Sequence, residues 1–172
     1  MSALPASVAV FGPGLMGGSL LMALRQRVPQ TKLGAWARRA EVIAELKSQQ
    51  LIDFGSTDAA EVAAACGMVV LCLPVDRLDD AAESIKEAVS PATWVTDVGS
   101  VKQSVVASLE KIFATHGNFV GSHPMCGSEE AGLGAARADL YEGALCVVTP
   151  TENSNPDAVR AVSDLWQAVG AR

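Results

Sequence analysis

Short apolar runs alternate along the chain with longer stretches whose apolar residues recur at helical spacing. The short runs are typical of buried strands and the longer stretches of amphipathic helices. Strands are predicted at residues 8–11, 31–36, 51–54, 68–73, 93–97, 119–121 and 145–149. Helices are predicted at residues 15–28, 41–49, 58–65, 77–89, 101–114 and 156–169. This alternation predicts an α/β fold, a doubly wound and mostly parallel sheet with helices on both faces.

The composition is that of one well-packed domain. The chain has 172 residues, of which 49% are hydrophobic and 19% charged, and a chain of this length buries a sizeable core. Its net charge of −6 argues against a nucleic-acid surface or a basic membrane-binding face. The longest apolar run, residues 66–75, is much shorter than the roughly 20 residues of a membrane-spanning helix. We therefore expect a single domain over residues 1–172 that binds neither nucleic acid nor membrane.

Cysteine and histidine usage argues against disulfides and against a metal site. No two cysteines form a C-x-x-C pair, and with only two histidines a structural zinc site is not expected. Residues 1–7 contain no Lys or Arg and so do not resemble a secretory signal. We expect free thiols in a cytoplasmic protein. The residues concerned are Cys66, Cys72, Cys126, Cys146, His116 (interpreted as a turn residue) and His123.

A glycine-rich turn joins the first predicted strand to the first predicted helix. In the pattern G-x-G-x-x-G the first glycine allows a tight turn, the second lets the backbone approach a pyrophosphate, and the third lets helix and strand pack closely. The helix N-terminus then faces the phosphates. The alternative is a turn without a ligand, but the strand–turn–helix context favours a Rossmann-type dinucleotide site. The motif consists of Gly12, Pro13, Gly14, Leu15, Met16 and Gly17, with backbone contacts to the cofactor also expected from Leu15 and Met16.

The end of the second predicted strand bears on which cofactor is bound. NAD-binding folds usually carry an acidic residue about 20 positions after the glycines, where it binds the ribose 2′-hydroxyl. Here that position is Ala37, and Arg38 and Arg39 follow it. Two guanidinium groups and no carboxylate favour a 2′-phosphate, and therefore NADP over NAD. The alternative is that both arginines lie on a solvated helix start and that NAD is used.

Two further motifs follow predicted strands. Residues 97–102 read D-V-G-S-V-K, and residues 121–129 read G-S-H-P-M-C-G-S-E. Ligands of open parallel sheets lie beyond the carboxyl ends of the strands, so both motifs are expected at the cofactor edge. They would bring the hydroxyl of Ser100, the ammonium of Lys102 and the imidazole of His123 near the nicotinamide.

With these motifs the sequence resembles the prephenate and arogenate dehydrogenases of tyrosine biosynthesis. The blocks G-P-G-L-M-G-G-S, D-V-G-S-V-K and G-S-H-P-M-C-G-S-E-x-x-G occur in the family's order, and the third is the specific one. The resemblance extends over essentially the whole chain, but only over the nucleotide-binding half of the family's architecture. It implies oxidative decarboxylation of prephenate to 4-hydroxyphenylpyruvate, with hydride transfer to NAD(P)⁺, or the corresponding reaction of arogenate.

The resemblance also implies roles for individual residues. His123 matches the family's catalytic histidine, which hydrogen-bonds the substrate hydroxyl, and Ser100 matches a serine between that region and the nicotinamide ribose. Lys102 matches a lysine that helps to bind substrate carboxylates, and Ser122 is assigned to the same substrate side. Three alternatives remain: Ser100 as a helix N-cap, Lys102 as a solvated side chain and His123 as a structural residue. The remaining expected cofactor contacts are Pro74 and Gly99.

The sequence departs from the family's pattern at its C-terminal end. Members of the family continue into an all-helical domain that forms the homodimer, closes over the substrate and supplies an arginine for its carboxylate. No such domain follows residue 172, and the alternation predicts another strand after the helix at 156–169. We therefore expect a chain truncated before the helical domain, which binds cofactor but turns over its small-molecule substrate poorly or not at all.

Two other functions remain open. One is an oxidoreductase of the β-hydroxyacid dehydrogenase or imine reductase type, which shares the glycine turn but not the block at 121–129. The other is a non-catalytic cofactor-sensing module that docks a partner where the helical domain is absent. A methyltransferase is less compatible, because Arg38 and Arg39 replace the acid that would hold an adenosine ribose.

Overall fold

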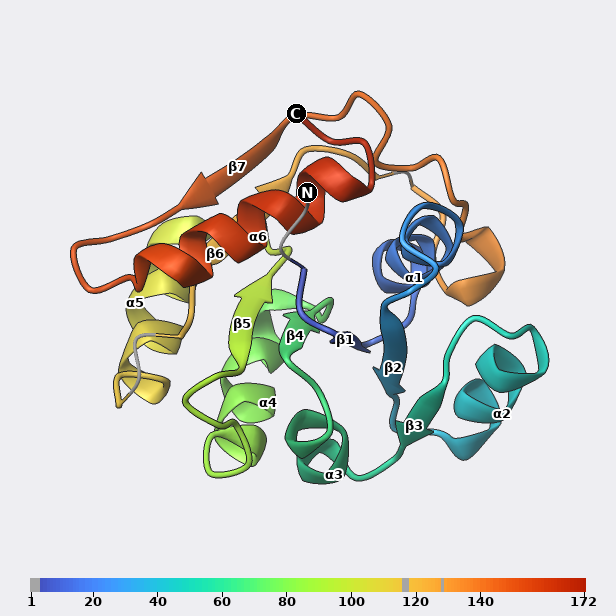
Figure 1. Ribbon diagram of the computed structural model, residues 1–172, viewed down its shortest axis with the longest axis horizontal. Helices are drawn as coiled ribbons and strands as arrows, with labels where there is room; N and C mark the ends of the chain where they lie inside the picture. The colour runs from blue at the N-terminus through green and yellow to red at the C-terminus, as the bar shows by residue number, and fades with distance from the viewer. Residues whose placement is uncertain (1–3, 116–117, 128) are drawn as a thin grey trace.

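A five-stranded parallel sheet in the order β3-β2-β1-β4-β5 forms the centre of the molecule (Figure 1). The computed structural model describes residues 4–115, 118–127 and 129–172, so His116 and Ser128 lie outside it. The α/β prediction is confirmed. The strands are β1 (Ser7–Phe11), β2 (Lys32–Trp36), β3 (Phe54–Ser56), β4 (Met68–Leu71) and β5 (Trp94–Asp97).

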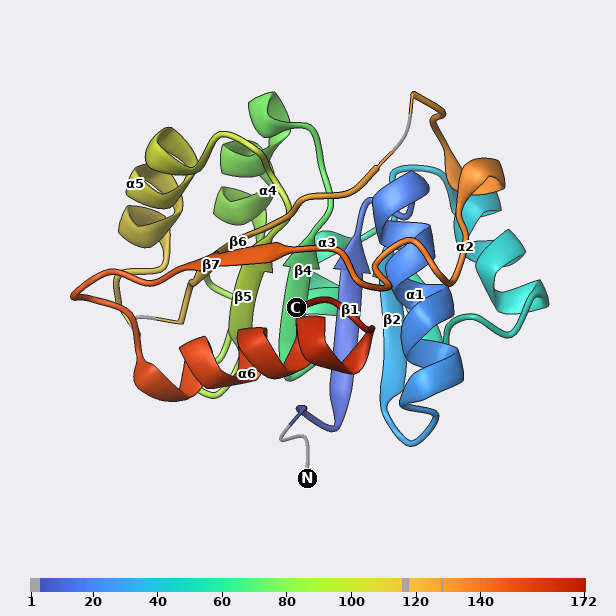
Figure 2. The same ribbon diagram turned by 90° about the horizontal axis from the view of Figure 1, so that it is seen from above.

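Helices cover both faces of the sheet (Figures 1 and 2). Val8 and Val10 of β1 belong to the core on one face, whereas Ala9 and Phe11 belong to the core on the other. This alternation explains why β1 reads as a continuous apolar run. The first face packs against α1 (Leu15–Arg27), α2 (Ala40–Ser48) and α6 (Pro156–Ala168). The second packs against α3 (Ala59–Ala64), α4 (Leu78–Ile85) and α5 (Lys102–Ile112).

The C-terminal part leaves the parallel pattern. Phe119 makes a single parallel bridge to Val95 of β5, and the chain then enters β6 (Gly121–Pro124), which pairs antiparallel with β7 (Cys146–Thr149). The predicted strand at 119–121 is therefore displaced to Gly121–Pro124. The pairing that creates β6 is with a distant segment, so no local pattern indicates it. Two short 3₁₀ helices, η1 (Val75–Arg77) and η2 (Leu133–Ala135), complete the elements.

Two element boundaries differ from the prediction for local reasons. The strand predicted at 51–54 begins only at Phe54, because α2 ends in a turn that uses the preceding residues. Gln50 has φ +57°, and Leu51 N donates to Leu46 O, which is the Schellman motif that ends a helix with a left-handed residue. The helix predicted at 77–89 is split into η1 and α4, and it ends at Ile85.

The last residue already pairs with the segment before β7. Arg172 N donates to Ala144 O, and Cys146 N donates to Arg172 O, both at 2.9 Å, which is the bonding pattern of a parallel pair. Within the part of the chain that the structure describes, no helix is long and apolar enough to cross a membrane.

Candidate active site

The turn between β1 and α1 depends on the absence of side chains at three glycines. Gly12 has φ +88°, a conformation that L-residues rarely adopt. A Cβ at Gly17 would lie 2.4 Å from Gly12 O and 2.7 Å from Val10 Cγ1, so this glycine lets α1 rest directly on β1. At Gly14 a Cβ would meet no atom within 4 Å, which leaves its outer side open to a ligand.

The N-terminus of α1 is suited to an anion. Its N-cap residue Gly14 provides no side-chain cap, and its first turn contains no acidic residue. The helix start therefore keeps its backbone N–H groups and its partial positive charge for another partner. In contrast, α3 and α6 are capped by the side chains of Asp58 and Asn155.

A cleft of about 550 Å³ adjoins the glycine turn at the carboxyl edge of the sheet. Arg38 and Arg39 line it, and both are exposed. Among the described residues that line it none is acidic, so this part, here called the arginine end, offers positive charge to an anion. The predicted cofactor residues that line it are Gly12, Gly14, Arg38, Arg39 and Pro74.

A second hollow of about 390 Å³ continues the cleft toward the β5–α5 loop. The two share five lining residues and so form one trough across the carboxyl edge. This part is here called the serine end, after Ser100, whose neighbours Val98 and Gly99 also line it. The shared residues are Gly14, Cys72, Leu73, Pro74 and Gly132. The predicted residues that line the serine end are Gly14, Leu15, Met16, Pro74, Gly99 and Ser100.

One wall of this trough was not predicted from the sequence. Gly132 lines both ends, and Leu133 lines the arginine end, although no strand, helix or site residue was predicted in this segment. Leu133 packs against the start of α1, where a Cβ at Gly18 would lie 2.6 Å from Leu133 Cδ1. Tyr141 also fixes this part of the chain to α1, because its hydroxyl donates to Met16 O at 2.8 Å. The signal in the sequence was the extra glycine at position 18, directly after the G-x-G-x-x-G motif.

A buried cluster of hydrogen bonds supports the serine end from behind. The wholly buried Asp97 ends β5 and pairs with the ammonium of Lys102. Lys102 Nζ also donates to Ser122 O at 2.9 Å, while Ser122 N donates to Asp97 Oδ1 at 3.3 Å. We call these three residues the Asp97 clasp. Burial lowers the pKa of the Lys102 ammonium below its usual value, and the carboxylate of Asp97 opposes that effect.

The side chain of Ser122 belongs to the interior. Its hydroxyl is fully buried, donates to Asp97 O at 2.6 Å, and contacts Thr96 Oγ1 at 3.0 Å. Trp166 of α6 donates its Nε1–H to the same oxygen at 2.9 Å. These contacts join β5, β6 and α6, and give the hydroxyl a structural role. The sequence analysis assigned Ser122 to the substrate side, but the structure turns its side chain inward.

Ser100 and His123 belong to the two segments that the clasp joins, the β5–α5 loop and β6. Ser100 is exposed at the serine end. The N-cap of α5 is Val101, and no side chain caps that helix, so the alternative of Ser100 as an N-cap does not hold. His123 follows Ser122 in β6 and therefore projects from the opposite face of that strand. It is half-buried, opposite Val147 of β7, and does not line the trough itself.

The thiols are not placed for nucleophilic chemistry. All four cysteines are free, as predicted, but only Cys66 is fully buried. Burial raises the pKa of the Cys66 and Cys146 thiols to about 12 and also raises that of Cys72, which lines both ends of the trough. Thiols with such pKa values stay protonated near neutral pH. Among the described residues, no group of three or more His, Cys, Asp or Glu could hold a metal ion.

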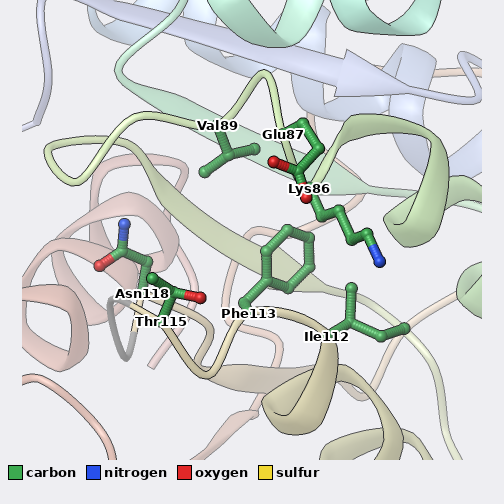
Figure 3. A pocket seen from close by; sticks show the side chains of 7 residues that line it. All are labelled: Lys86, Glu87, Val89, Ile112, Phe113, Thr115 and Asn118. Atoms are coloured by element: carbon green, nitrogen blue, oxygen red, sulfur yellow. The ribbon is translucent and has the colours of Figure 1, made fainter.

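A separate hollow of about 230 Å³ lies between the ends of α4 and α5, at the amino edge of the sheet (Figure 3). The ring of Phe113 stands between Lys86 and Ile112 on one side and Thr115 and Asn118 on the other. It shares no lining residue with the trough. Because ligands of open parallel sheets bind beyond the carboxyl ends of the strands, the trough is the candidate site.

Comparisons with known proteins agree with this geometry. The chain is 29% identical to a prephenate dehydrogenase of Bacillus subtilis over 176 residues, which covers 99% of this chain and 46% of that protein. A crystal structure of prephenate dehydrogenase from A. aeolicus, with hydroxyphenyl propionate and NAD⁺, superposes with TM-score 0.90 at 30% identity, covering 100% and 59% of the two chains. Synechocystis arogenate dehydrogenase gives TM-score 0.89 at 27% identity, covering 96% and 58%.

The chain thus spans about half the length of these relatives. A model of the family described as "Prephenate dehydrogenase, nucleotide-binding domain" matches residues 21–172. That match covers most of the chain. The chain therefore belongs to the family of prephenate dehydrogenase nucleotide-binding domains.

Proposed function

We propose that this chain is the nucleotide-binding part of an NAD(P)-dependent dehydrogenase that acts on prephenate or arogenate by oxidative decarboxylation. The observation that carries the proposal is the continuous trough at the carboxyl edge, with an uncapped helix N-terminus in its middle. The trough runs from Arg38 and Arg39 past the glycine turn to Ser100, so it offers separate places for the two halves of a dinucleotide. Membership of the family supplies the reaction class.

The residues of the trough fit a nicotinamide dinucleotide. The start of α1 and the open side of Gly14 would hold the pyrophosphate, since no protein atom lies within 4 Å of the place where a Cβ of residue 14 would stand. Arg38 and Arg39 would hold a 2′-phosphate, which favours NADP. The nicotinamide half would then extend to the serine end, toward Ser100. When bound, the cofactor accepts the hydride that the substrate ring loses.

The chain's own catalytic task is to move one proton and to orient the substrate. A ring nitrogen of His123 accepts the proton of the substrate hydroxyl, because a neutral imidazole can take up a proton near neutral pH. The hydroxyl of Ser100 orients the reacting groups by hydrogen bonding. Loss of carbon dioxide then leaves an aromatic ring, so the chain need not form a covalent intermediate.

The cofactor proposal is tested by titrating the chain with NADP⁺ and NAD⁺ in a calorimeter. We expect NADP⁺ to bind at least about tenfold more tightly, which corresponds to about 1.4 kcal/mol. Replacement of both arginines (Arg38→Gln and Arg39→Gln) should abolish that preference, and Arg77→Gln, outside the trough, serves as control. Equal binding of NADP⁺ and NAD⁺ would overturn the NADP preference alone. Failure of both to bind would overturn the dinucleotide site.

The substrate proposal is tested by assaying turnover of prephenate and of arogenate with saturating cofactor. The chain covers only about half of its relatives, and their remaining part would complete the substrate site. We expect cofactor binding with little or no turnover by this chain alone. Turnover at the rate of a full-length family member would contradict the proposal that a further domain is needed.

A further inference from the structure

Several hydrogen bonds surround the ion pair of Asp97 and Lys102 at the end of β5. The carboxylate of Asp97 is wholly buried and accepts hydrogen bonds from Gly99 N at 2.8 Å, from Ser122 N at 3.3 Å and from the Lys102 ammonium. Isolated burial of a carboxylate is strongly unfavourable, so it needs these partners. A buried ion pair is, however, weak evidence for added stability, because well-packed apolar residues often serve as well.

Lys102 is committed to the same cluster. It is the first residue of α5, and its side chain is only 15% exposed. Its ammonium has three N–H groups, of which one donates to Asp97 and one to Ser122 O. The Asp97 carboxylate also neutralises its charge, which weakens any attraction that Lys102 could exert on a substrate carboxylate.

The clasp joins the two segments that carry the proposed chemistry. Between Asp97 and Lys102 the chain forms the loop that lines the serine end with Val98, Gly99 and Ser100. Gly99 N is itself fixed by the Asp97 carboxylate. On the other side, the clasp holds both the N–H and the carbonyl of Ser122, the residue directly before His123. The cluster therefore sets the position of the Ser100 loop relative to β6.

We propose that Asp97 and Lys102 are positioning residues, which hold the Ser100 loop in the shape that receives the nicotinamide half of the cofactor. This inference rests on the proposed function. It assigns to Lys102 an action through Asp97 and the loop, in place of direct contact with substrate. It also implies that the two halves of the cofactor depend on different groups, because the clasp is bonded to Gly99 at the serine end and includes no residue that lines the arginine end.

The test removes both charges together. Asp97→Asn with Lys102→Gln keeps polar side chains at both positions and leaves no unpaired buried charge, but it replaces one of the two accepting oxygens of Asp97 with an N–H donor. Titrations compare NADP⁺ with 2′,5′-ADP, which represents the adenosine half alone. If the wild-type chain prefers NAD⁺, the pair is NAD⁺ and ADP. We expect the variant to bind the whole cofactor about tenfold more weakly and the adenosine half within about twofold of wild type.

A matched control distinguishes the effect of breaking the clasp from the effect of removing any pair of opposite charges. Glu83 and Lys86 form an exposed i,i+3 ion pair on α4 at 2.8 Å, and Glu83→Gln with Lys86→Gln should change neither titration. An equal loss of both ligands in the clasp variant, or no loss of either, would overturn the inference. A wild-type chain that binds neither ligand would overturn the proposed function as well, so the two failures are distinguishable.

A second measurement needs no variant and decides the case if the double substitution does not fold. In amide NMR spectra of the wild-type chain, the Gly99 and Ser122 N–H groups report directly on the Asp97 carboxylate to which they are bonded. We expect both signals to shift on addition of the whole cofactor and to stay in place on addition of the adenosine half. Identical shifts with both ligands, or none with either, would contradict the proposal.

Discussion

The two ends of the trough are built in opposite ways. At the arginine end the site consists of backbone around the glycine turn, with two exposed arginine side chains on its rim. At the serine end the shape depends on the side chains of Asp97 and Lys102, which bond the backbone of the β5–α5 loop and of β6. The glycine turn at the arginine end is local in sequence and sensitive to added atoms. The serine end is assembled from distant segments and sensitive to removed hydrogen bonds.

The largest expected effect is at the glycine turn. In Gly17→Ala the new methyl group would lie 2.4 Å from Gly12 O and 2.7 Å from Val10 Cγ1, so α1 must move away from β1. We expect the free energy of unfolding to fall by about 1–3 kcal/mol. Dinucleotide binding should become undetectable. Chemical denaturation and calorimetric titration measure the two quantities.

Gly14→Ala is the matched substitution that separates ligand binding from folding. Its methyl group would meet no protein atom within 4 Å, so the free energy of unfolding should change by only about 0.5 kcal/mol. The same methyl group would stand where the pyrophosphate must approach, so binding should weaken strongly. Wild-type affinity in this variant would contradict the placement of the phosphates at this turn.

A loss of stability without a loss of binding to the adenosine half is expected at Ser122, behind the serine end. Ser122→Ala leaves the buried Nε1–H of Trp166 without its partner at 2.9 Å, which should lower the free energy of unfolding by about 1–3 kcal/mol. Affinity for 2′,5′-ADP should not change, because this hydroxyl faces the interior. Thermal and chemical unfolding give the first quantity and calorimetry the second.

The control for this prediction lies on α6. The Ser163 hydroxyl donates to Val159 O within its own helix, so Ser163→Ala leaves no buried donor unpaired and should be nearly neutral. If Ser122→Ala left stability unchanged, the structural role of its hydroxyl would be wrong.

The contrast between the two ends also explains what the sequence could reveal. The glycine turn, its strand and its helix follow one another in the chain, and their spacing predicts both their structure and their place at the sheet edge. The motif at 97–102 was likewise placed at that edge from its position after a strand. In each case the position of the motif is set by local interactions or by the parallel order of the strands.

Other parts of the site depend on contacts that no local pattern encodes. β6 is a strand because it pairs with β7, and Asp97 is held by Ser122, which is 25 residues away. Leu133 reaches the start of α1 at Gly18, across most of the chain. The substrate role expected for Ser122 was implied by the resemblance of the block that also contains His123. The alternation of a strand places adjacent side chains on opposite faces, so that proximity in sequence was misleading.

The smallest expected effect is at a second aspartate, Asp53, at the amino edge of the sheet. Its carboxylate accepts from Leu33 N at 2.7 Å and pairs with Arg25 at 3.0 Å, as Asp97 pairs with Lys102, but its side chain is 42% exposed. Burial acts to raise its pKa, and the bonds from Leu33 and Arg25 outweigh that effect and leave the pKa below its usual value. Solvent screening limits the contribution of such a pair to less than about 1 kcal/mol.

The sign of the pH dependence follows from that lowered pKa. The ionised Asp53 stabilises the folded chain at pH values above its unfolded pKa of about 3.9, and this contribution disappears as the pH falls through the lower folded pKa. The Asp53→Asn variant should therefore be slightly less stable than wild type at pH 7. On acidification below pH ~4 its free energy of unfolding should fall by less than that of wild type. Denaturation midpoints at pH 7, 4 and ~2.5 measure this, with Asp76→Asn in the more exposed pair with Arg77 as control. Affinity for the whole cofactor and for the adenosine half should be unchanged at pH 7, because this aspartate lies at the edge opposite the trough. Altered cofactor affinity in Asp53→Asn would contradict this expectation, since it would show that an ion pair at the amino edge also shapes the site.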